Sequence, residues 1–291
     1  MTKNLIGTGV ALVTPFDVDL SIDYIGLGRL LEHVINGGAD YLVVCGTTGE
    51  SVTLSISEKS ELLKHVIDLN QNRLPIVYGI GGNNTQECIE TIENTEFNGV
   101  KAILSVSPYY NKPSQDGIIK HYNTIADSSP VPVILYNVPG RTSSNLSWQT
   151  TVTLSQHSNI IGIKEASGDL VQSMRIKSKV SDDFLLISGD DLLTGPLMSV
   201  GAVGVISVLA NAFPEVFRSM MDARQNNDYL KINGSISKLL EINSFMFTEG
   251  NPVGIKEVLH QMNICSNHVR LPLISASEGL KKAISSELGN I

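Results

Sequence analysis

The amino-acid sequence predicts an α/β protein with the architecture of a (β/α)8 TIM barrel and a C-terminal helical appendage. Eight short apolar runs rich in β-branched residues recur along the chain, and segments of helical length and periodicity separate them. Polar or glycine-rich residues follow most of these runs directly. An open, doubly wound sheet usually has fewer strands and a reversal of strand order, so the eightfold alternation favours the closed parallel barrel.

Each apolar run is taken as one strand of the barrel. The runs are Val10–Val13, Tyr41–Cys45, Ile76–Tyr78, Ala102–Val106, Val133–Tyr136, Ile160–Ile163, Phe184–Ile187 and Val203–Val208.

The segments between the runs carry helix-start signals. Ser55-Ile56-Ser57-Glu58, for example, has the spacing of a capping box ahead of a helical apolar pattern. After the eighth run the chain contains only predicted helices: Pro214–Gln225, Tyr229–Phe247, Pro252–Met262 and Ser275–Leu288. We therefore expect residues 1–225 to form the barrel, with its active site at the C-terminal ends of the strands, and residues 226–291 to form a helical region packed on it.

Composition narrows the classes of function. The 291 residues carry a formal net charge of -8, which argues against nucleic acid or an anionic membrane surface as a partner. No run of eighteen apolar residues is present and the N-terminus lacks a signal-peptide pattern, so the expected location is the cytoplasm. The three cysteines and six histidines have no metal-ligand spacing, and neither a metal site nor a disulfide framework is predicted.

The polar segments that follow the strands converge on one rim if the barrel closes, because the C-terminal ends of all eight strands lie on the same face. That face holds the active site in barrel enzymes. The segments are Thr14-Pro15, Gly46–Glu50, Gly79–Asn84, Ser107–Tyr110, Tyr136–Arg141, Lys164-Glu165, Gly189-Asp190 and Ser207.

Lys164 is unusual because it places an ammonium group at the end of the apolar strand that begins at Ile160. Desolvation there disfavours the charged form and so favours the neutral amine that attacks a carbonyl. The alternative is a lysine that reaches solvent or pairs with Glu165 or Asp169. The position at a strand end favours the catalytic interpretation.

Tyr136 ends a neighbouring predicted strand, and Arg141 follows it in a Pro-Gly turn. A phenol at this place can donate and accept a proton, although a structural tyrosine would give the same pattern. The arginine fork can hold a substrate carboxylate, although a surface arginine would look the same. A non-catalytic α/β binding protein would leave these two residues and Lys164 unexplained together.

Two glycine-rich segments remain. Gly46-Thr47-Thr48-Gly49 offers hydroxyl and backbone N–H groups for a small carboxylate, but it is a short and unspecific motif. Gly79–Asn84 resembles a dinucleotide fingerprint with Asn84 in place of its last glycine, so a nicotinamide site is not expected.

Four motifs together resemble the dihydrodipicolinate synthase family of the N-acetylneuraminate lyase and class I aldolase superfamily. The resemblance runs nearly end to end. The motifs are Gly46–Ser51, Ser107–Pro113, Tyr136–Thr142 and Gly162–Gly168, and Gly201–Ser207 adds to them.

The resemblance implies that the enzyme condenses pyruvate with L-aspartate 4-semialdehyde through a Schiff base on Lys164, without a cofactor. The product would be 4-hydroxy-tetrahydrodipicolinate, on the route to L-lysine and meso-diaminopimelate. Tyr136 would transfer protons, and Thr47 and Tyr110 would relay them, with Tyr110 donated by a neighbouring subunit. By the same mapping, Thr48, Gly189 and Ile206 would bind pyruvate and Arg141 would hold the carboxylate of the semialdehyde.

The alternative within the superfamily is N-acetylneuraminate lyase or another 2-keto-acid aldolase. Gly140-Arg141-Thr142 favours the lysine-pathway enzyme over it.

The family's tetramer, a dimer of dimers, is the expected assembly, and Ser51, Asn83, Glu87 and Tyr109 match its lysine-inhibitor pocket. Ile56 and Lys59 stand where enteric members have histidines, and the extra cation at Lys59 favours weak or absent inhibition.

Overall fold

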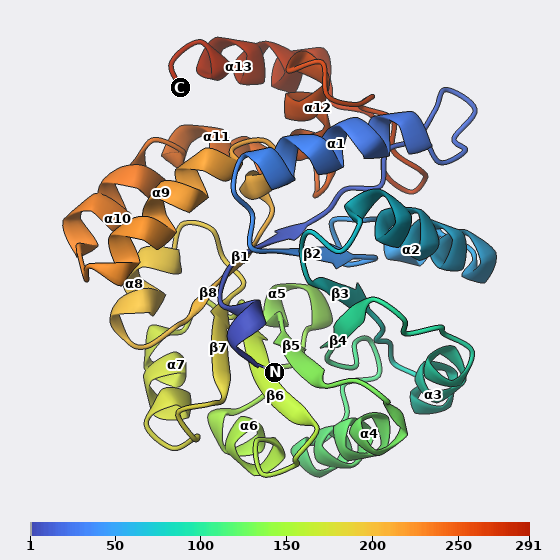
Figure 1. Cartoon of the computed structure of the whole chain (residues 1–291), viewed down its shortest axis with the longest axis vertical. Helices are drawn as coiled ribbons and strands as arrows, with labels where there is room; N and C mark the ends of the chain where they lie inside the picture. Colours follow the sequence, from blue (N-terminus) through green and yellow to red (C-terminus); the bar gives the residue numbers. More distant parts are fainter. Residues whose placement is uncertain (1) are drawn as a thin grey trace. The chain divides into compact units, whose positions relative to one another are not determined.

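The computed structural model describes residues 2–291, and its eight parallel strands follow one another in order around a closed barrel (Figure 1). This confirms the predicted fold class. Each predicted run overlaps an observed strand, and the bounds of the two differ by no more than three residues. The strands are β1 Gly7–Ala11, β2 Tyr41–Val44, β3 Ile76–Gly79, β4 Val100–Val106, β5 Val133–Asn137, β6 Ile160–Glu165, β7 Leu185–Ser188 and β8 Gly204–Ser207.

The chain divides into two compact units. Unit 1 consists of the described residues up to Gly7 and of Pro75–Ile206, and unit 2 consists of Thr8–Leu74 and Ser207–Ile291. The expected division at residues 225 and 226 stays a prediction.

Unit 1 contains strands β3 to β7 in continuous parallel pairing, with one helix or more between successive strands. Its strands are almost fully buried, because helices cover their outer side (Figure 1). The helices are α3 Thr85–Glu93, α4 Gln115–Ser128, α5 Pro139–Thr142, α6 Trp148–Leu154, α7 Leu170–Lys177 and α8 Thr194–Ser199, and the short helix η1 spans Thr2–Leu5.

Unit 2 contains the β1–β2 pair and most of the helical mass. The predicted capping box is confirmed: the Ser55 hydroxyl accepts from the Glu58 N–H at 3.2 Å, and the Glu58 carboxylate accepts from the Ser55 N–H at 2.8 Å. The elements are α1 Tyr24–Asn36, η2 Ser51–Thr53, α2 Ile56–Asn70, η3 Leu209–Asn211, α9 Pro214–Gln225, α10 Tyr229–Ser237, α11 Leu240–Thr248, α12 Val253–Gln261 and α13 Glu278–Leu288.

One predicted helix was wrong in its extent. The segment Tyr229–Phe247 was expected to be a single helix, and it forms α10 and α11, which Lys238 and Leu239 separate. The end of α10 reads Asn-Gly-Ser-Ile-Ser, a run of weak helix formers that does not resist a break. The other C-terminal helices lie within three residues of their predicted bounds.

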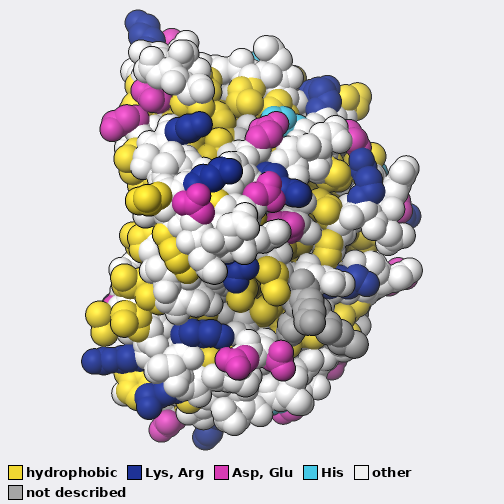
Figure 2. Space-filling model, turned by 60° about the vertical axis from the view of Figure 1, so that its left-hand side comes forward, with side chains coloured by type: hydrophobic (Ala, Val, Ile, Leu, Met, Phe, Trp, Pro, Cys, Tyr) yellow, Lys and Arg dark blue, Asp and Glu magenta, His cyan; other side chains and the backbone are white. Residues whose placement is uncertain are grey.

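The chain carries charges of both signs on its surface. On the face drawn in Figure 2, lysine and arginine side chains are interspersed with aspartate and glutamate. Among the described residues, no helix is long and apolar enough to cross a bilayer.

Candidate active site

Lys164 and Tyr136 lie side by side in unit 1, at the C-terminal ends of β6 and β5. They are register partners in the parallel pair, so their side chains project from the same face of the sheet. Both are buried, with 6% of Lys164 and 8% of Tyr136 exposed. The Lys164 Nζ lies 4.4 Å from the centroid of the Tyr136 ring. The structure therefore brings the predicted nucleophile and the predicted proton-transfer group together.

The carboxylates that could have paired with Lys164 are engaged elsewhere. Glu165 accepts hydrogen bonds from the side chains of Asn137 and Gln172. Asp169 caps α7 by accepting from the Gln172 N–H at 2.9 Å. These partners argue against the interpretation of Lys164 as one half of a structural ion pair.

Gly189 follows β7, and its lack of a side chain leaves room for Lys164. A Cβ atom there would lie 2.6 Å from the Cβ of Ala166 and 3.1 Å from the Lys164 Cε. The Gly189 N–H donates to the Glu165 carbonyl at 2.8 Å, which joins the ends of β6 and β7. Ile206, the other predicted pocket residue of unit 1, lies in β8 with 1% exposed.

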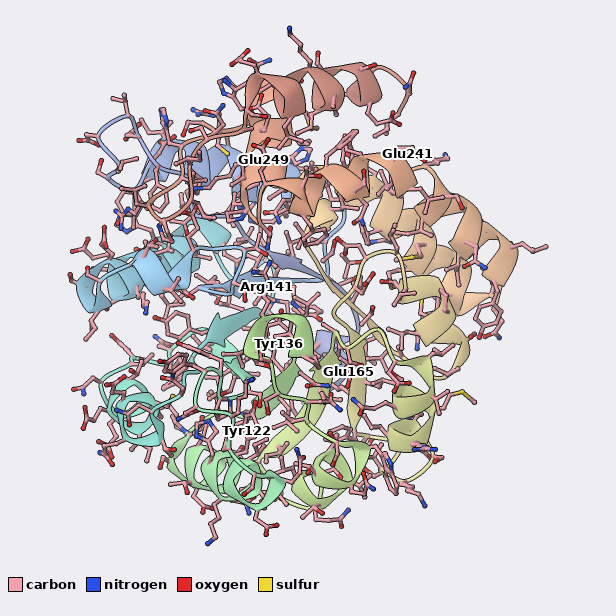
Figure 3. The ribbon with its side chains drawn as sticks, turned by 180° about the vertical axis from the view of Figure 1, so that it is seen from behind. Tyr122, Tyr136, Arg141, Glu165, Glu241 and Glu249 are labelled. Atoms are coloured by element: carbon pink, nitrogen blue, oxygen red, sulfur yellow. The ribbon has the colours of Figure 1, made fainter. Side chains whose placement is uncertain are left out.

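Arg141 lies one short turn beyond Tyr136, on α5, and Figure 3 labels both residues. Its side chain is exposed, whereas the turn that carries it is well bonded. The Thr142 hydroxyl donates to the Ser144 carbonyl at 2.7 Å, and the Arg141 N–H donates to the Val138 carbonyl at 2.9 Å. A well-bonded turn thus presents an exposed guanidinium group that is available to an anion.

The segment after β4 carries two further candidates. Tyr110 is 86% exposed and has φ of 70°, which is uncommon for a large side chain. Tyr109 is half-buried, and its carbonyl accepts from the Asn83 side chain at 3.2 Å. The structure therefore brings together Asn83 and Tyr109 of the predicted inhibitor pocket, while Glu87 is exposed in the first turn of α3.

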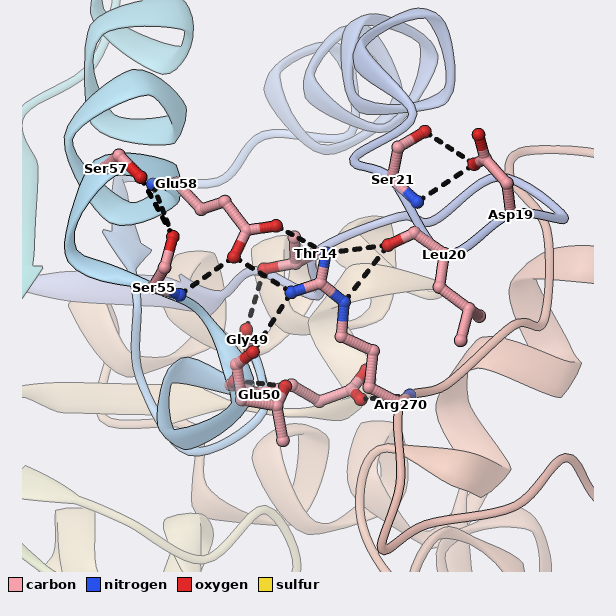
Figure 4. Close-up of polar contacts among 11 residues, drawn as sticks. Thr14, Asp19, Leu20, Ser21, Gly49, Glu50, Ser55, Ser57, Glu58 and Arg270 are labelled. Carbon is pink, nitrogen blue, oxygen red and sulfur yellow. Dashed lines mark hydrogen bonds and ion pairs between the residues drawn. The ribbon is translucent and has the colours of Figure 1, made fainter.

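In unit 2, the threonine loop after β2 is held at several points. The Thr48 hydroxyl, 3% exposed, accepts from the Asn251 side chain at 3.0 Å. The Thr14 hydroxyl donates to the Gly49 carbonyl at 2.7 Å (Figure 4). The carbonyl of Thr47 accepts from the N–H of Glu50 at 3.1 Å, which closes the turn. Ser51 follows as the first residue of η2.

A buried ion pair anchors the end of this loop, and no pattern in the sequence predicts it. The Glu50 carboxylate accepts from the Lys256 Nζ at 2.5 Å and from the Arg270 N–H at 3.0 Å. Lys256 is fully buried and also lies 4.1 Å from the centroid of the Phe16 ring. Burial lowers the pKa of Lys256, and the charge of Glu50 opposes that change.

The Arg270 guanidinium extends the same cluster. It donates to both carboxylate oxygens of Glu58, at 2.5 and 3.0 Å, and to the Leu20 carbonyl (Figure 4). This hydrogen bonding lowers the pKa of Glu58 to about 2. Lys256 lies in a helix and Arg270 in a loop, and from sequence alone such cationic residues are ordinarily expected at the surface. Only the fold reveals that each has a carboxylate partner.

Comparison with known proteins places these features in one family. The model of the dihydrodipicolinate synthetase family matches residues 4–291. The 4-hydroxy-tetrahydrodipicolinate synthase of Cytophaga hutchinsonii is 52% identical over 271 residues, which cover 93% of this chain and 91% of that protein.

Two solved structures have nearly the same fold. The chloride-inhibited dihydrodipicolinate synthase of Acinetobacter baumannii, complexed with pyruvate, has a TM-score of 0.95 at 37% identity and covers 98% of both chains. The enzyme of Cyanidioschyzon merolae with lysine bound has a TM-score of 0.95 at 34% identity, covering 99% of this chain and 98% of that one. The chain therefore belongs to the dihydrodipicolinate synthetase family.

Proposed function

We propose that the chain condenses pyruvate with L-aspartate 4-semialdehyde to give 4-hydroxy-tetrahydrodipicolinate, in the biosynthesis of L-lysine and meso-diaminopimelate. Membership of the family and the name of the Cytophaga relative support this activity. The observation that carries it is the buried amine of Lys164 packed 4.4 Å from the ring centroid of Tyr136.

In the first half of the reaction, the Lys164 amine attacks the keto carbon of pyruvate, and the carbinolamine loses water to form an imine. The imine withdraws electrons, so a proton leaves the methyl carbon and an enamine forms. Tyr136 is the group placed to donate the proton that the departing hydroxyl needs and to accept the one from carbon.

In the second half, the enamine carbon forms a bond to the aldehyde carbon of the semialdehyde, whose oxygen takes up a proton. The amino group of the semialdehyde then attacks the imine carbon and displaces Lys164, which closes the ring and restores the free amine. The overall balance is one pyruvate and one semialdehyde consumed, with one product and one water formed.

Other residues receive roles from the family motifs and from their surroundings. Thr47 and Tyr110 are assigned to the proton relay with Tyr136, and the exposure of Tyr110 fits a residue donated to a neighbouring subunit. Thr48, Gly189 and Ile206 are assigned to pyruvate. Arg141 is assigned to the carboxylate of the semialdehyde, which a bidentate arginine holds well.

The assembly that fits this role for Tyr110 is a homotetramer built as a dimer of dimers, in the cytoplasm. The large exposed apolar residues of the chain, among them Val52 and Ile56, are compatible with subunit contacts. Lysine inhibition through Ser51, Asn83, Glu87 and Tyr109 is a further proposal. It is supported by the lysine-bound Cyanidioschyzon structure and opposed by Lys59.

The rival activity is that of N-acetylneuraminate lyase or another 2-keto-acid aldolase, which would use the same lysine and tyrosine. Arg141 favours the semialdehyde because a small substrate with a carboxylate needs a cationic partner. A coupled assay that offers aspartate semialdehyde and N-acetylmannosamine side by side distinguishes the two. Turnover of the sugar alone would reject the proposed reaction.

The imine itself is tested by reduction with borohydride in the presence of pyruvate. Peptide mapping should find the mass of pyruvic acid less one oxygen atom added at Lys164. An unlabelled protein, or a label on another lysine, would overturn the assignment.

A further inference from the structure

Glu165 is a buried carboxylate in unit 1 that is surrounded by N–H donors. It is 2% exposed. The Asn137 side-chain amide lies 3.1 Å from each of its oxygens, and the Gln172 amide donates to Oε2 at 3.0 Å. The Ser167 N–H donates to Oε1 at 2.7 Å. Three independent donors thus stabilise one anion, and hydrogen bonds to a charged group contribute more than neutral ones.

These donors join the two strands that carry the reacting residues. Glu165 follows Lys164 on β6, Asn137 follows Tyr136 on β5, and the two residues are register partners just as Lys164 and Tyr136 are. Because side chains alternate along a strand, Glu165 and Asn137 project to the face opposite that of the reacting pair. Their hydrogen bonds therefore hold the strand ends together from behind.

The contacts continue into the segment after Arg141. The Asn137 amide also donates to the Asn145 side chain at 2.8 Å, and its carbonyl oxygen accepts from the Leu146 N–H at 3.0 Å. The Asn145 amide donates in turn to the Gln172 side chain at 2.9 Å. One group of side chains thus connects β5, β6, α7 and the end of the turn that carries Arg141.

Fixed geometry of this kind matters for imine formation. The amine has to approach the keto carbon along a narrow path, and a misplacement of about 1 Å costs on the order of 10²-fold in rate. Nothing in the proposed reaction consumes the charge of Glu165, since the proton transfers are assigned to Tyr136. Burial of the carboxylate costs desolvation free energy, which its hydrogen bonds offset. We therefore assign Glu165 the role of holding the ends of the neighbouring strands in place.

We propose that Asn137, Glu165 and Gln172 are positioning residues for imine formation, and that the Asn137–Glu165 pair sets the relative placement of Lys164 and Tyr136. The inference rests on the roles proposed above for those two residues. Neither Asn137 nor Glu165 touches the substrate in this account.

The test measures how fast borohydride traps pyruvate on Lys164. In Glu165→Gln an amide replaces the carboxylate without a change of shape. Its NH2 group faces the Asn137 donor in either orientation, and the Gln172 or the Ser167 donor as well. We expect trapping and kcat/KM for pyruvate to fall on the order of 10²-fold. Gln172→Ala removes one of the three donors to Glu165, together with the contacts between Gln172 and Asn145. It leaves the Asn137–Glu165 pair in place, so it serves as the milder variant in which a smaller loss is expected if Glu165→Gln does not fold.

A swap of the two groups tests whether the pair itself is responsible. In the double variant Asn137→Asp with Glu165→Gln, the new carboxylate at position 137 accepts from the new amide at position 165 and still accepts from the Leu146 N–H, while the donation from position 137 to Asn145 is lost. We expect it to trap pyruvate about tenfold faster than Glu165→Gln alone, because the interaction is restored. Asn145→Ala, which removes only the Asn145 contacts, measures the effect of that loss; no recovery in the swap beyond what Asn145→Ala explains would mean that the pair does not set the placement.

Asn159 supplies the matched control at the other end of β6. Its side chain donates to the carbonyls of Ala126 and Ser129, both at 2.9 Å, just before the strand begins. Asn159→Ala should lower stability and leave the trapping rate of the folded protein unchanged. Equal losses in Asn159→Ala and Glu165→Gln would overturn the inference, because general loosening of β6 would then explain both.

Failure of the proposed function and failure of the positioning role give different labelling results. A parent protein without label at Lys164 removes the proposed function itself. A parent that is labelled at Lys164, together with a Glu165→Gln variant that is labelled as fast, keeps the function and refutes the positioning role.

Discussion

The replacement Gly189→Ala adds a single carbon atom beside the proposed nucleophile. The added Cβ would lie 2.6 Å from the Ala166 Cβ and 3.1 Å from the Glu165 carbonyl oxygen and the Lys164 Cε. Carbon atoms pack best at about 3.5–4.0 Å, so the end of β7 has to move away from β6 by about 1 Å. That movement works against the hydrogen bond from the Gly189 N–H to Glu165.

Two effects follow from this displacement. Overpacking in a buried place typically costs about 1–3 kcal/mol, which urea unfolding would measure. A change of about 1 Å in the placement of the Lys164 side chain, which the added Cβ presses at its Cε, should lower kcat/KM for pyruvate on the order of 10²-fold, measured in the coupled assay. Gly28→Ala in α1 is the control, since a Cβ there meets nothing within 4 Å and should stabilise the helix by about 0.5–1 kcal/mol. A Gly189→Ala enzyme with parental kcat/KM would refute the steric argument.

Three other predictions concern residues with distinct roles. Lys256→Met should destabilise the protein by about 3–5 kcal/mol in urea unfolding, because the Glu50 carboxylate stays buried without its cation. Adding Glu50→Gln should recover part of this loss. A double variant no more stable than Lys256→Met would contradict the prediction. Arg141→Ala should raise KM for the semialdehyde while pyruvate trapping stays unchanged, and equal effects on both substrates would remove its proposed role. Burial lowers the pKa of His121 to about 4, so the folded state binds this proton less readily than the unfolded state does. Stability should therefore fall by about 3 kcal/mol as the pH drops from about 6.5 to about 4, and His121→Gln should remove that part of the fall. Parallel pH profiles of the two proteins would show that His121 is not responsible.

The barrel could be predicted because its signals are local. Each strand is an apolar run with a polar end, and the capping box at Ser55 reports the start of α2 without help from the rest of the chain. The break between α10 and α11 has a weaker local signal, since Gly234 lowers helix propensity without forbidding a helix. The position of the break depends on tertiary packing, which a short stretch of sequence does not reveal.

Part of the site follows from the same reasoning. Lys164 and Tyr136 can each be predicted as candidate site residues because each lies at the end of an apolar strand. That the two are register partners on neighbouring strands is seen only in the structure. Glu165 was considered only as a possible ion-pair partner of Lys164, and Asn137 was given no role of its own, although the alternation of side chains along a strand places both behind the reacting pair. What the sequence cannot supply is the identity of their partners, since Gln172 and Asn145 come from other elements.

The buried ion pair was equally hidden. Lys256 lies in α12, and a lysine in a helix is ordinarily solvated. Glu50 ends a loop whose interpretation from sequence concerned only its threonine and glycine residues. Only the burial of both groups reveals that they neutralise each other.

The most direct test of the account removes the amine on which the chemistry depends. Lys164→Ala and Lys164→Arg should fold as the parent does and should lose condensation of pyruvate with aspartate semialdehyde down to the uncatalysed background, because neither side chain can form the imine. Turnover by either variant at the parental rate would contradict the central claim.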